Sequence, residues 1–321
     1  MEFLDQPGVP SKPRERKYGP RFASPVNSPA WDWTDDTQFL QVTKGCSHNS
    51  CRFCTFYKNI PFEKVPFDEV EYYTEYLVLC NKMTPVHRVS LQAANAFHLS
   101  YDELMRISEL LHNKLPDLQS IGGYGRMSDL RDKTVEQLKS LKDAGYGGLF
   151  FGVESADDNL LRAMNKGYDS AELYEAGAKL RDSGMMWTCT IMFGLGGHGY
   201  GFEHAIKTAE YFNEVKPAIV AGVSLTLVYD PFTRMVPRLK KAVERGEFVE
   251  AGEIERYEEM KVFIEHLNTR CLYTCEHSSM PIGLRGIIPD HKQKLLDSIS
   301  KIIEEGDEDG FAWFRQNVQA V

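Results

Sequence analysis

The sequence predicts an α/β protein, with a partial (β/α)6 TIM-like barrel, an N-terminal arm and a helical C-terminal extension. Between residues 39 and 235, short apolar runs with strand character alternate with amphipathic helical stretches, which is typical of strand–helix units and a parallel sheet. Each run ends in polar, glycine or cysteine residues, where such barrels build their active sites. We expect an arm at 1–36, the barrel at 37–240 and the extension at 241–321.

The arm is expected because residues 1–36 contain repeated proline together with Trp31 and Trp33. Proline fixes one backbone dihedral and removes an N–H donor, so this composition disfavours both a regular helix and a central strand. The segment is predicted to lie against the body of the protein.

The first three strand–helix units follow the arm. Their strands are expected at 39–43, 88–92 and 120–125, and their helices at 67–82, from Ser100 onward and at 134–144. Ser100 and Glu103 form a capping-box pattern at the start of the second helix. Gly145 is well placed to end the third helix in a left-handed conformation.

Three further strands are expected at 148–152, 188–193 and 219–227. The chain beyond residue 240 is predicted to be mostly helical, with helices at 253–268 and 290–305. Residues Cys271–Ile288, between these two helices, are interpreted as an irregular stretch.

The most informative motif is the C-x₄-C-x₂-C run formed by Cys46, Cys51 and Cys54, directly after the first strand. Three thiolates on one loop can hold three corners of a 4Fe–4S cluster, which normally takes four, and would leave one iron free to bind a ligand. Zinc bound by a Cys₃His set that includes His48 is an alternative. Cysteines with no metal at all are another.

Composition restricts the partners and the compartment. The net charge of −9 disfavours a broad nucleic-acid surface. No apolar run approaches the ~18 residues of a membrane span. Seven cysteines, an odd number, in a chain without an export signal indicate a reducing cytosol. We therefore expect a cytoplasmic protein with no membrane partner.

The cysteine loop followed by six strand–helix units resembles the radical S-adenosylmethionine (radical SAM) superfamily, and in particular the branch that shares a core with methylthiotransferases, coproporphyrinogen dehydrogenase and the elongator catalytic subunit. Two further motifs carry the likeness: G-V-E-S at 152–155 followed by L-L-R-A-M-N-K-G at 160–167, and G-L-G-G at 194–197. Two features depart from the family pattern. The cysteine spacing is one residue longer than usual, and Q-A-A-N at 92–95 replaces a Gly-Gly-Glu turn.

The resemblance implies a metal-binding oxidoreductase that cleaves S-adenosylmethionine (SAM) reductively at a 4Fe–4S cluster. The resulting 5′-deoxyadenosyl radical would abstract hydrogen from a small or medium-sized substrate, with an electron donor such as flavodoxin or ferredoxin. The family motifs assign the cluster to Cys46, Cys51 and Cys54. The residues expected to contact SAM are Phe53, Asn95, Arg126, Glu154, Ser155, Gly194, Gly196 and Gly197.

Several of these residues have simpler alternative roles. Phe53 could be a core aromatic, and Arg126 a solvated side chain. Glu154 could pair with a nearby lysine or cap a helix, because a buried carboxylate is costly unless it is paired. Ser155 could cap the helix that contains residues 160–164.

The remaining cysteines carry weaker expectations. Cys80 and Cys189 are interpreted as packing residues. Cys271 and Cys275, in a C-x₃-C pattern, leave an auxiliary cluster conceivable, although two cysteines are too few for one.

Substrate recognition is expected outside the barrel strands, because a radical intermediate must be shielded from solvent. The arm and the stretch Cys271–Ile288 could cover the barrel mouth, and His277 and Arg285 are the candidate substrate-reading residues. A plain surface connector is the alternative for this stretch. Modification of tRNA or a peptide, and a non-enzymatic zinc or iron–sulfur protein, remain alternative functions.

Overall fold

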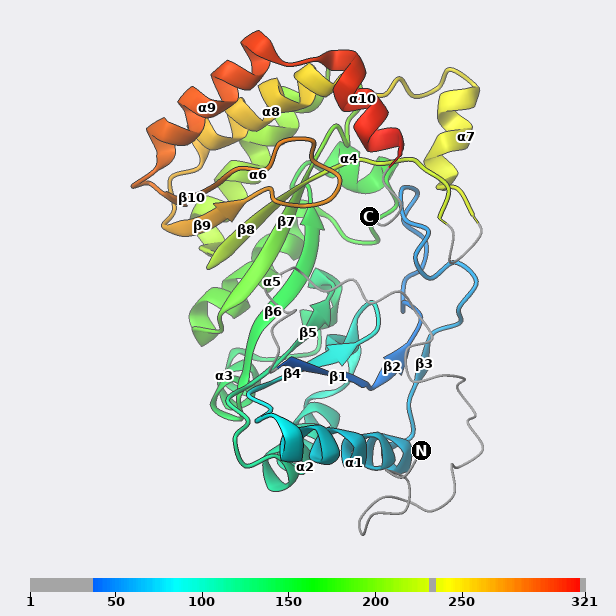
Figure 1. Cartoon of the computed structure of the whole chain (residues 1–321), viewed down its shortest axis with the longest axis vertical. Coiled ribbons are helices and arrows are strands. Elements are labelled where there is room, and N and C mark those ends of the chain that lie inside the picture. Colours follow the sequence, from blue (N-terminus) through cyan, green and yellow to red (C-terminus); the bar gives the residue numbers. More distant parts are fainter. Residues whose placement is uncertain (1–36, 231–234, 318–321) are drawn as a thin grey trace.

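The computed structural model describes residues 37–230 and 235–317, so the predicted arm at 1–36 lies outside the described residues. Six strands occupy the predicted positions and run parallel to one another in chain order. They are β1 (Thr37–Gln41), β4 (Arg88–Gln92), β5 (Ser120–Gly125), β6 (Tyr146–Glu154), β7 (Trp187–Phe193) and β8 (Ile219–Ser224). The sheet curves with helices on its outer side (Figure 1), which confirms the predicted α/β partial barrel.

Two more strands extend this sheet to eight in the described part of the chain. β9 (Cys271–Thr274) pairs parallel with β8, and β10 (Arg285–Ile288) pairs antiparallel with β9. The interpretation of Cys271–Ile288 as irregular is therefore wrong. A four-residue strand is too short to display a clear two-residue alternation, and its strand character comes from pairing with β8 and not from local pattern.

Helices pack on the outer face of the sheet. Those following the parallel strands are α1 (Phe67–Met83), α2 (Tyr101–Lys114), α3 (Val135–Asp143), α4 (Asp158–Ala163), α5 (Ser170–Ser183) and α6 (Gly201–Val215). The C-terminal part adds α7 (Arg238–Glu244), α8 (Glu253–His266), α9 (Lys292–Glu305) and α10 (Glu308–Gln316). The capping box of Ser100 and Glu103 forms as predicted. Gly145 has φ +94° after α3, as its C-terminal position requires.

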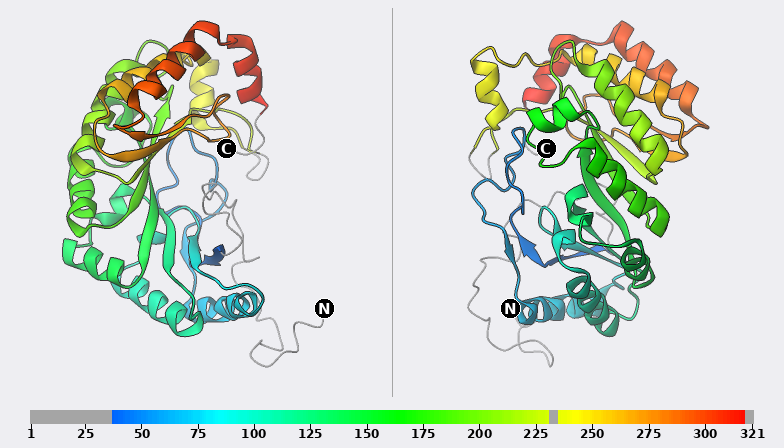
Figure 2. Two further views of the ribbon diagram at one scale, coloured as in Figure 1. Left: turned by 60° about the vertical axis from the view of Figure 1, so that its left-hand side comes forward. Right: turned by 180° about the vertical axis from the view of Figure 1, so that it is seen from behind.

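The first predicted strand is divided in two. β1 ends at Gln41, and β2 (Thr43–Lys44) turns away to pair antiparallel with β3 (Glu63–Lys64). The two strands of this hairpin flank the cysteine loop, which lies beside the C-terminal ends of the parallel strands (Figure 2). A separate strand pair therefore supports the cysteine loop.

One large apolar cluster joins the sheet to its outer helices. Cys189 on β7 is fully buried in it, and Cys80 on α1 packs against it, so the packing role predicted for both cysteines is confirmed. None of the helices in the described ranges combines the length and the apolar character needed to cross a membrane.

Candidate functional site

Cys46, Cys51 and Cys54 lie on one loop, half-buried and without disulfide bonds. Burial raises the pKa of Cys51, and burial together with the neighbouring Cys51 thiol raises the pKa of Cys54 to about 12. Within residues 37–230 and 235–317, no three His, Cys, Asp or Glu side chains converge on a point that one metal ion could occupy. A cubane cluster has no such requirement, because each thiolate binds a different iron atom.

One side of the cysteine loop is fixed by Asn95, which follows β4. The backbone N–H of Ser47 donates to Asn95 Oδ1 (3.2 Å), and Asn95 Nδ2 donates to Ser47 Oγ (2.7 Å). The same amide group donates to the buried carboxylate of Asp129 (3.1 Å), which also accepts from His98 Nδ1 (2.9 Å) and from the backbone N–H of Arg126 (2.8 Å). Asn95 therefore positions the loop. Asp129 was not a predicted site residue, since its partners come from separate parts of the sequence.

The opposite side of the loop is fixed by residues 163–168, the second half of the family-like motif. His48 Nε2 donates to the carbonyl of Asn165 (2.6 Å), and Asn165 Nδ2 donates to the carbonyl of Ser50 (3.1 Å). Gly167 has φ +80°, and a Cβ atom there would lie 2.7 Å from the His48 ring. The segment thus forms a wall of the cysteine loop. With Nε2 bonded to a carbonyl, His48 would have to complete a zinc site through Nδ1.

A buried ion pair joins this wall to the end of β6. Lys166 pairs with Glu154 at the end of β6, and the two side chains are 5% and 12% exposed. Burial opposes a charge on Lys166, but the adjacent Glu154 carboxylate more than offsets this, so the pKa of Lys166 is raised. Lys166 Nζ also lies 5.8 Å from the ring centre of Phe53. The pairing of Glu154 with a lysine, one of its alternative roles, is present in the structure.

Glu154 also adopts a left-handed backbone conformation, with φ +62°. Such a conformation costs of order 1–3 kcal/mol in a non-glycine residue, and in folded proteins it is concentrated at functional sites. This backbone conformation places the Glu154 carboxylate at the end of β6, next to residues 163–168.

Arg126, at the end of β5, adds a second cation to the same place. Its guanidinium donates to the carbonyl of Lys166 and lies 5.6 Å from the ring centre of Tyr168. Arg126 is half-buried, and its guanidinium is engaged with the protein.

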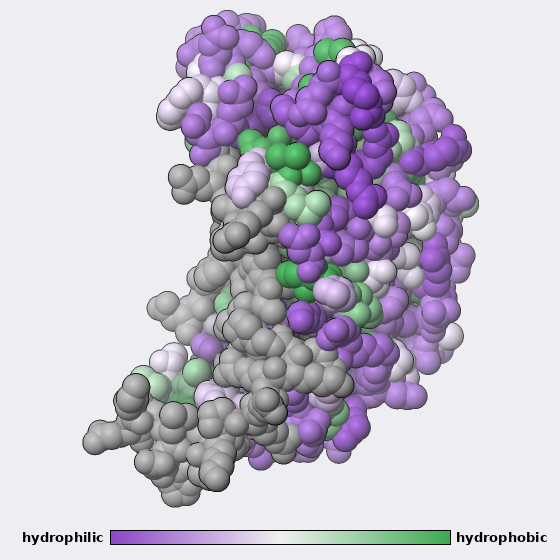
Figure 3. Space-filling model, turned by 90° about the vertical axis from the view of Figure 1, so that its right-hand side faces the viewer, coloured by the Kyte–Doolittle hydropathy of each residue, from purple (hydrophilic) through white to green (hydrophobic). Residues whose placement is uncertain are grey.

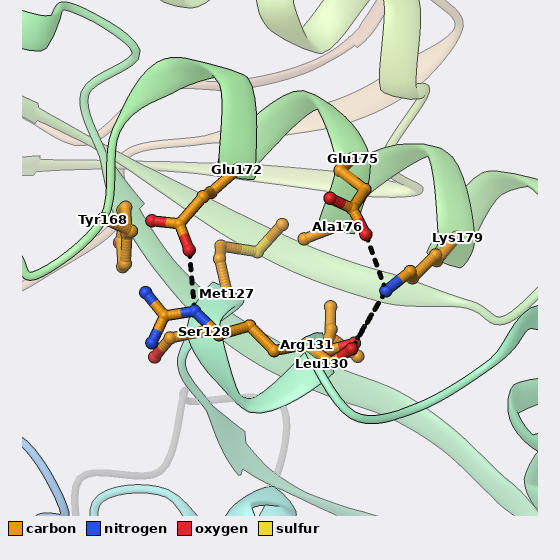
Figure 4. A pocket seen from close by; sticks show the side chains of 9 residues that line it. All are labelled: Met127, Ser128, Leu130, Arg131, Tyr168, Glu172, Glu175, Ala176 and Lys179. Carbon is orange, nitrogen blue, oxygen red and sulfur yellow. Dashed lines mark hydrogen bonds and ion pairs between the residues drawn. The ribbon is translucent and has the colours of Figure 1, made fainter.

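Figure 4 shows the cavity beside Tyr168. Its volume of about 20 Å³ is room for one water molecule, so it is not a substrate site.

Ser155 is fully buried behind this site. Its hydroxyl lies 2.9 Å from His204 Nδ1 and accepts from the backbone N–H of Asp157 (3.0 Å). Asp157 itself caps α4, since its carboxylate accepts from the N–H of Leu160 (3.0 Å). The helix-capping alternative for Ser155 is wrong, because α4 begins three residues after Ser155 and Asp157 occupies the cap position.

The glycine turn after β7 is closely packed against the protein. Gly194 and Gly197 both have φ +76°, and a Cβ atom at Gly197 would lie 2.5 Å from the carbonyl oxygen of Val249. At Gly196 it would lie 2.9 Å from the Tyr200 ring. Backbone conformation therefore favours glycine at Gly194 and Gly197, and contact with the Val249 carbonyl excludes a side chain at Gly197.

A buried polar cluster from α6 and α8 supports this turn. Glu259 Oε2 accepts from the backbone N–H of Gly194 (2.8 Å), and Glu259 Oε1 lies 3.3 Å from His204 Nε2. Burial raises the pKa of Glu259 to about 8 and lowers the pKa of His204 to about 4. Arg256 opposes the shift of Glu259, and Glu255 adds to it. Both Glu259 and His204 are consequently uncharged at neutral pH.

This cluster predicts a pH dependence of stability. The pKa of Glu259 is higher in the folded chain (about 8) than in an unfolded one (about 4.3), so ionisation opposes folding. The lowered pKa of His204 (about 4 in the folded chain) acts in the opposite direction up to its unfolded value of about 6.5. The two contributions therefore nearly cancel below about pH 6.5, and the free energy of unfolding should fall as the pH rises from about 6.5 to about 8. Glu259→Gln keeps an acceptor for Gly194 and should flatten this slope in urea-unfolding curves. An unchanged slope would show that Glu259 titrates normally.

The two predicted substrate-reading residues lie in different surroundings. His277 follows β9, and its Nδ1 accepts from Ser279 Oγ (2.8 Å), which in turn accepts from the N–H of Ser224 at the end of β8 (2.9 Å). Burial lowers the pKa of His277. Arg285 begins edge strand β10; its side chain is 58% exposed, and Nη1 lies 3.7 Å from Glu276 Oε2. His277 is thus connected to β8 by hydrogen bonds through Ser279, whereas Arg285 is exposed on the edge strand of the sheet.

Cys271 and Cys275 are both buried. Burial raises their pKa values to about 12 and about 11, respectively. Cys275 Sγ accepts from the N–H of Leu284 (3.2 Å), which ties the end of β9 to the residue before β10. These surroundings fit structural thiols.

Comparison with known families identifies the class of protein to which this chain belongs. The model of the radical SAM superfamily matches residues 40–212, more than half of the chain, and the chain belongs to this superfamily of enzymes. The predicted resemblance is thereby confirmed.

Individual relatives are more distant. The chain is 24% identical over 170 residues to the heme chaperone HemW of Bacillus subtilis, covering 51% of this chain and 44% of HemW. It is 30% identical over 186 residues to the ribosomal protein uS12 methylthiotransferase RimO of Anaeromyxobacter sp., covering 54% of this chain and 38% of RimO. The chain thus spans less than half the length of these curated relatives.

Among solved structures, the archaeal Elp3 of Methanocaldococcus infernus matches with a TM-score of 0.48 and 13% identity. The match covers 84% of this chain and 63% of that one.

Proposed function

We propose that Cys46, Cys51 and Cys54 bind a 4Fe–4S cluster, and that the chain uses it to cleave SAM and abstract hydrogen from a small or medium-sized substrate. When bound, the cluster supplies the electron that splits SAM into methionine and a 5′-deoxyadenosyl radical. The observation that carries the proposal is the loop itself: three free thiols held on one side by Asn95 and on the other by residues 163–168.

The donor set fits such a cluster. The thiols share one loop, and Lys58 lies near all three. Its ammonium donates to the carbonyls of Asn49 (2.7 Å) and Cys51 (3.1 Å). A metal deprotonates the thiols that coordinate it, and a nearby cation stabilises the resulting thiolates. Burial disfavours negatively charged thiolates, and the nearby Lys58 ammonium offsets part of this cost.

The Glu154–Lys166 pair provides complementary charges for an amino acid group. The methionyl end of SAM carries an ammonium and a carboxylate, and such a zwitterion can exchange with a buried ion pair without leaving either charge unpaired. In this proposal Glu154 accepts from the ammonium, and Lys166 with Arg126 binds the carboxylate. Phe53, beside Lys166, would border the adenine, and Gly194, Gly196 and Gly197 would admit it. Ser155 would act indirectly, because its hydroxyl already has protein partners.

The proposed unit of function is the barrel at 37–240, completed by β9 and β10 from residues 241–321. Modification of tRNA or a peptide is the alternative, and the net charge of −9 weighs against an extended nucleic-acid surface. Methylthiotransfer is the named activity of RimO and heme chaperoning that of HemW, and neither activity is proposed for this chain.

Binding of SAM to the cluster can be tested by spectroscopy. The anaerobically reconstituted and reduced protein should give a 4Fe–4S electron paramagnetic resonance signal that changes on addition of SAM, since SAM would occupy the iron without a thiolate. A signal unaffected by saturating SAM would refute the proposed cofactor arrangement.

Substrate recognition gives a separate prediction. His277→Ala and Arg285→Ala should lower substrate turnover, while slow formation of 5′-deoxyadenosine continues without substrate. The matched control is Arg270→Ala, which removes an exposed arginine paired with Asp290 at the other end of β9. Parental turnover by both His277→Ala and Arg285→Ala would show that these residues do not read the substrate.

A further inference from the structure

The proposed function requires an electron from outside the chain, and one face next to the cysteines has an unusual charge for this protein. Residues 44–62 and 235–241 contain six lysine or arginine residues and no aspartate or glutamate, whereas the whole chain has a net charge of −9. The six cations are Lys44, Arg52, Lys58, Arg238, Lys240 and Lys241, and the last five are defined here as the basic face.

The two segments are joined in the structure. The backbone N–H of Leu239 donates to the carbonyl of Arg52 (2.9 Å), so the first turn of α7 is attached to the cysteine loop. Phe53 packs against a buried apolar cluster that includes Leu239 and Ala242. The views in Figures 1 and 2 agree that α7 lies beside the upper end of this loop. Arg52, Lys58 and the cations of α7 therefore belong to one surface.

Acidic side chains border this surface, since Lys240 pairs with Glu250 (3.6 Å) and Glu247 lies near Arg52. Arg238 and Lys241 are therefore its exposed cations on α7.

This surface is adjacent to the thiols. The Lys58 ammonium donates to the carbonyl of Cys51 (3.1 Å), and the carbonyl of Arg52 accepts from Leu239 on α7 (2.9 Å). Lys58 and the first turn of α7 therefore both lie beside the cysteine loop. Arg238 and Lys241 are exposed, and the upper part of the side view in Figure 3 is mostly hydrophilic. Electron transfer slows steeply with distance, so a donor gains by docking where the cysteines are near the surface.

We propose that the basic face docks an acidic electron-transfer protein, which passes one electron at a time to the cysteine-bound centre. The donor is oxidised by one electron and the centre is reduced by one. Charge complementarity of this kind raises association rates and depends on ionic strength. The inference rests on the proposed function and adds the place of reductant entry. A nucleic acid is the other polyanion that such a face could attract, and the test separates the two.

The test reverses two exposed charges outside the cysteine loop, Arg238→Glu with Lys241→Glu. The matched control is Lys294→Glu with Lys301→Glu on α9, which changes the net charge equally on exposed positions of another helix. Formation of 5′-deoxyadenosine from SAM is measured with enzymatically reduced flavodoxin, an acidic one-electron donor, and separately with dithionite, which needs no docking.

At low salt the basic-face variant should lose about tenfold or more of its flavodoxin-driven rate, the scale of electrostatic steering. It should keep its dithionite-driven rate, and the control should keep both rates. Added salt should reduce the difference in flavodoxin-driven rate between the parent and the basic-face variant. Flavodoxin-driven rates equal to those of the parent would overturn the docking site, as would an equal loss in the control.

Loss of tRNA binding by the variant with an unchanged flavodoxin rate would assign the face to nucleic acid instead. Absence of 5′-deoxyadenosine from the parent with dithionite would overturn the proposed function itself. The failure of the docking site and the failure of the function are therefore distinguishable.

Discussion

Replacing Cys46, Cys51 or Cys54 with alanine should abolish iron–sulfur binding and all SAM cleavage. Anaerobic protein should be brown and carry about four irons per chain, as one cubane held by three thiolates implies. Each substitution removes a ligand that the rest of the loop cannot replace, because the side chains of Ser47 and His48 are engaged in hydrogen bonds to other segments. Iron analysis and visible absorption measure the loss.

The control is Cys271→Ala, which removes a buried thiol on β9. This variant should keep its iron and colour and lose only a little stability through the small cavity that it creates. Stoichiometric zinc without visible absorption in the parent protein would contradict the assignment of an iron–sulfur cluster.

Glu154→Gln should weaken SAM binding by about 1–3 kcal/mol, the scale of one charge-assisted hydrogen bond. It should also destabilise the fold by about 3–5 kcal/mol, because the buried Lys166 ammonium loses its partner. Equilibrium binding of SAM and urea unfolding measure the two effects separately.

The double variant Glu154→Gln with Lys166→Met distinguishes binding from stability. Removing both charges should restore much of the unfolding free energy, since no buried charge is left unpaired. Affinity for SAM should remain low, because its ammonium has lost Glu154 and only Arg126 is left to bind its carboxylate. Recovery of SAM affinity in the double variant would show that the ion pair is purely structural.

The local pattern of the sequence was sufficient for most of the fold. The strand β4 and the start of α2 at Ser100 lie where alternating apolar residues and a capping box predict them. β9 and β10 were missed because each has only four residues, and because β9 forms by pairing with β8, which lies before α7 and α8 in the sequence. Local periodicity carries no information about such pairing.

The site was predictable only in part for a similar reason. The cysteine motif is contiguous and visible in the sequence. The roles of Asn95, Asp129 and Lys166 depend on contacts between residues 12 to 48 positions apart. A lysine placed twelve positions after Glu154 in the M-N-K-G motif was the one available signal for the buried pair.

Formation of 5′-deoxyadenosine by the anaerobically reconstituted protein with SAM and dithionite decides whether the cysteine loop holds a SAM-cleaving cluster. We expect 5′-deoxyadenosine and methionine in equal amounts from the parent chain, and neither from the variant in which Cys46, Cys51 and Cys54 are all replaced with alanine. A parent chain that binds a 4Fe–4S cluster but leaves SAM intact, or a triple variant that still cleaves it, would refute the proposed SAM cleavage.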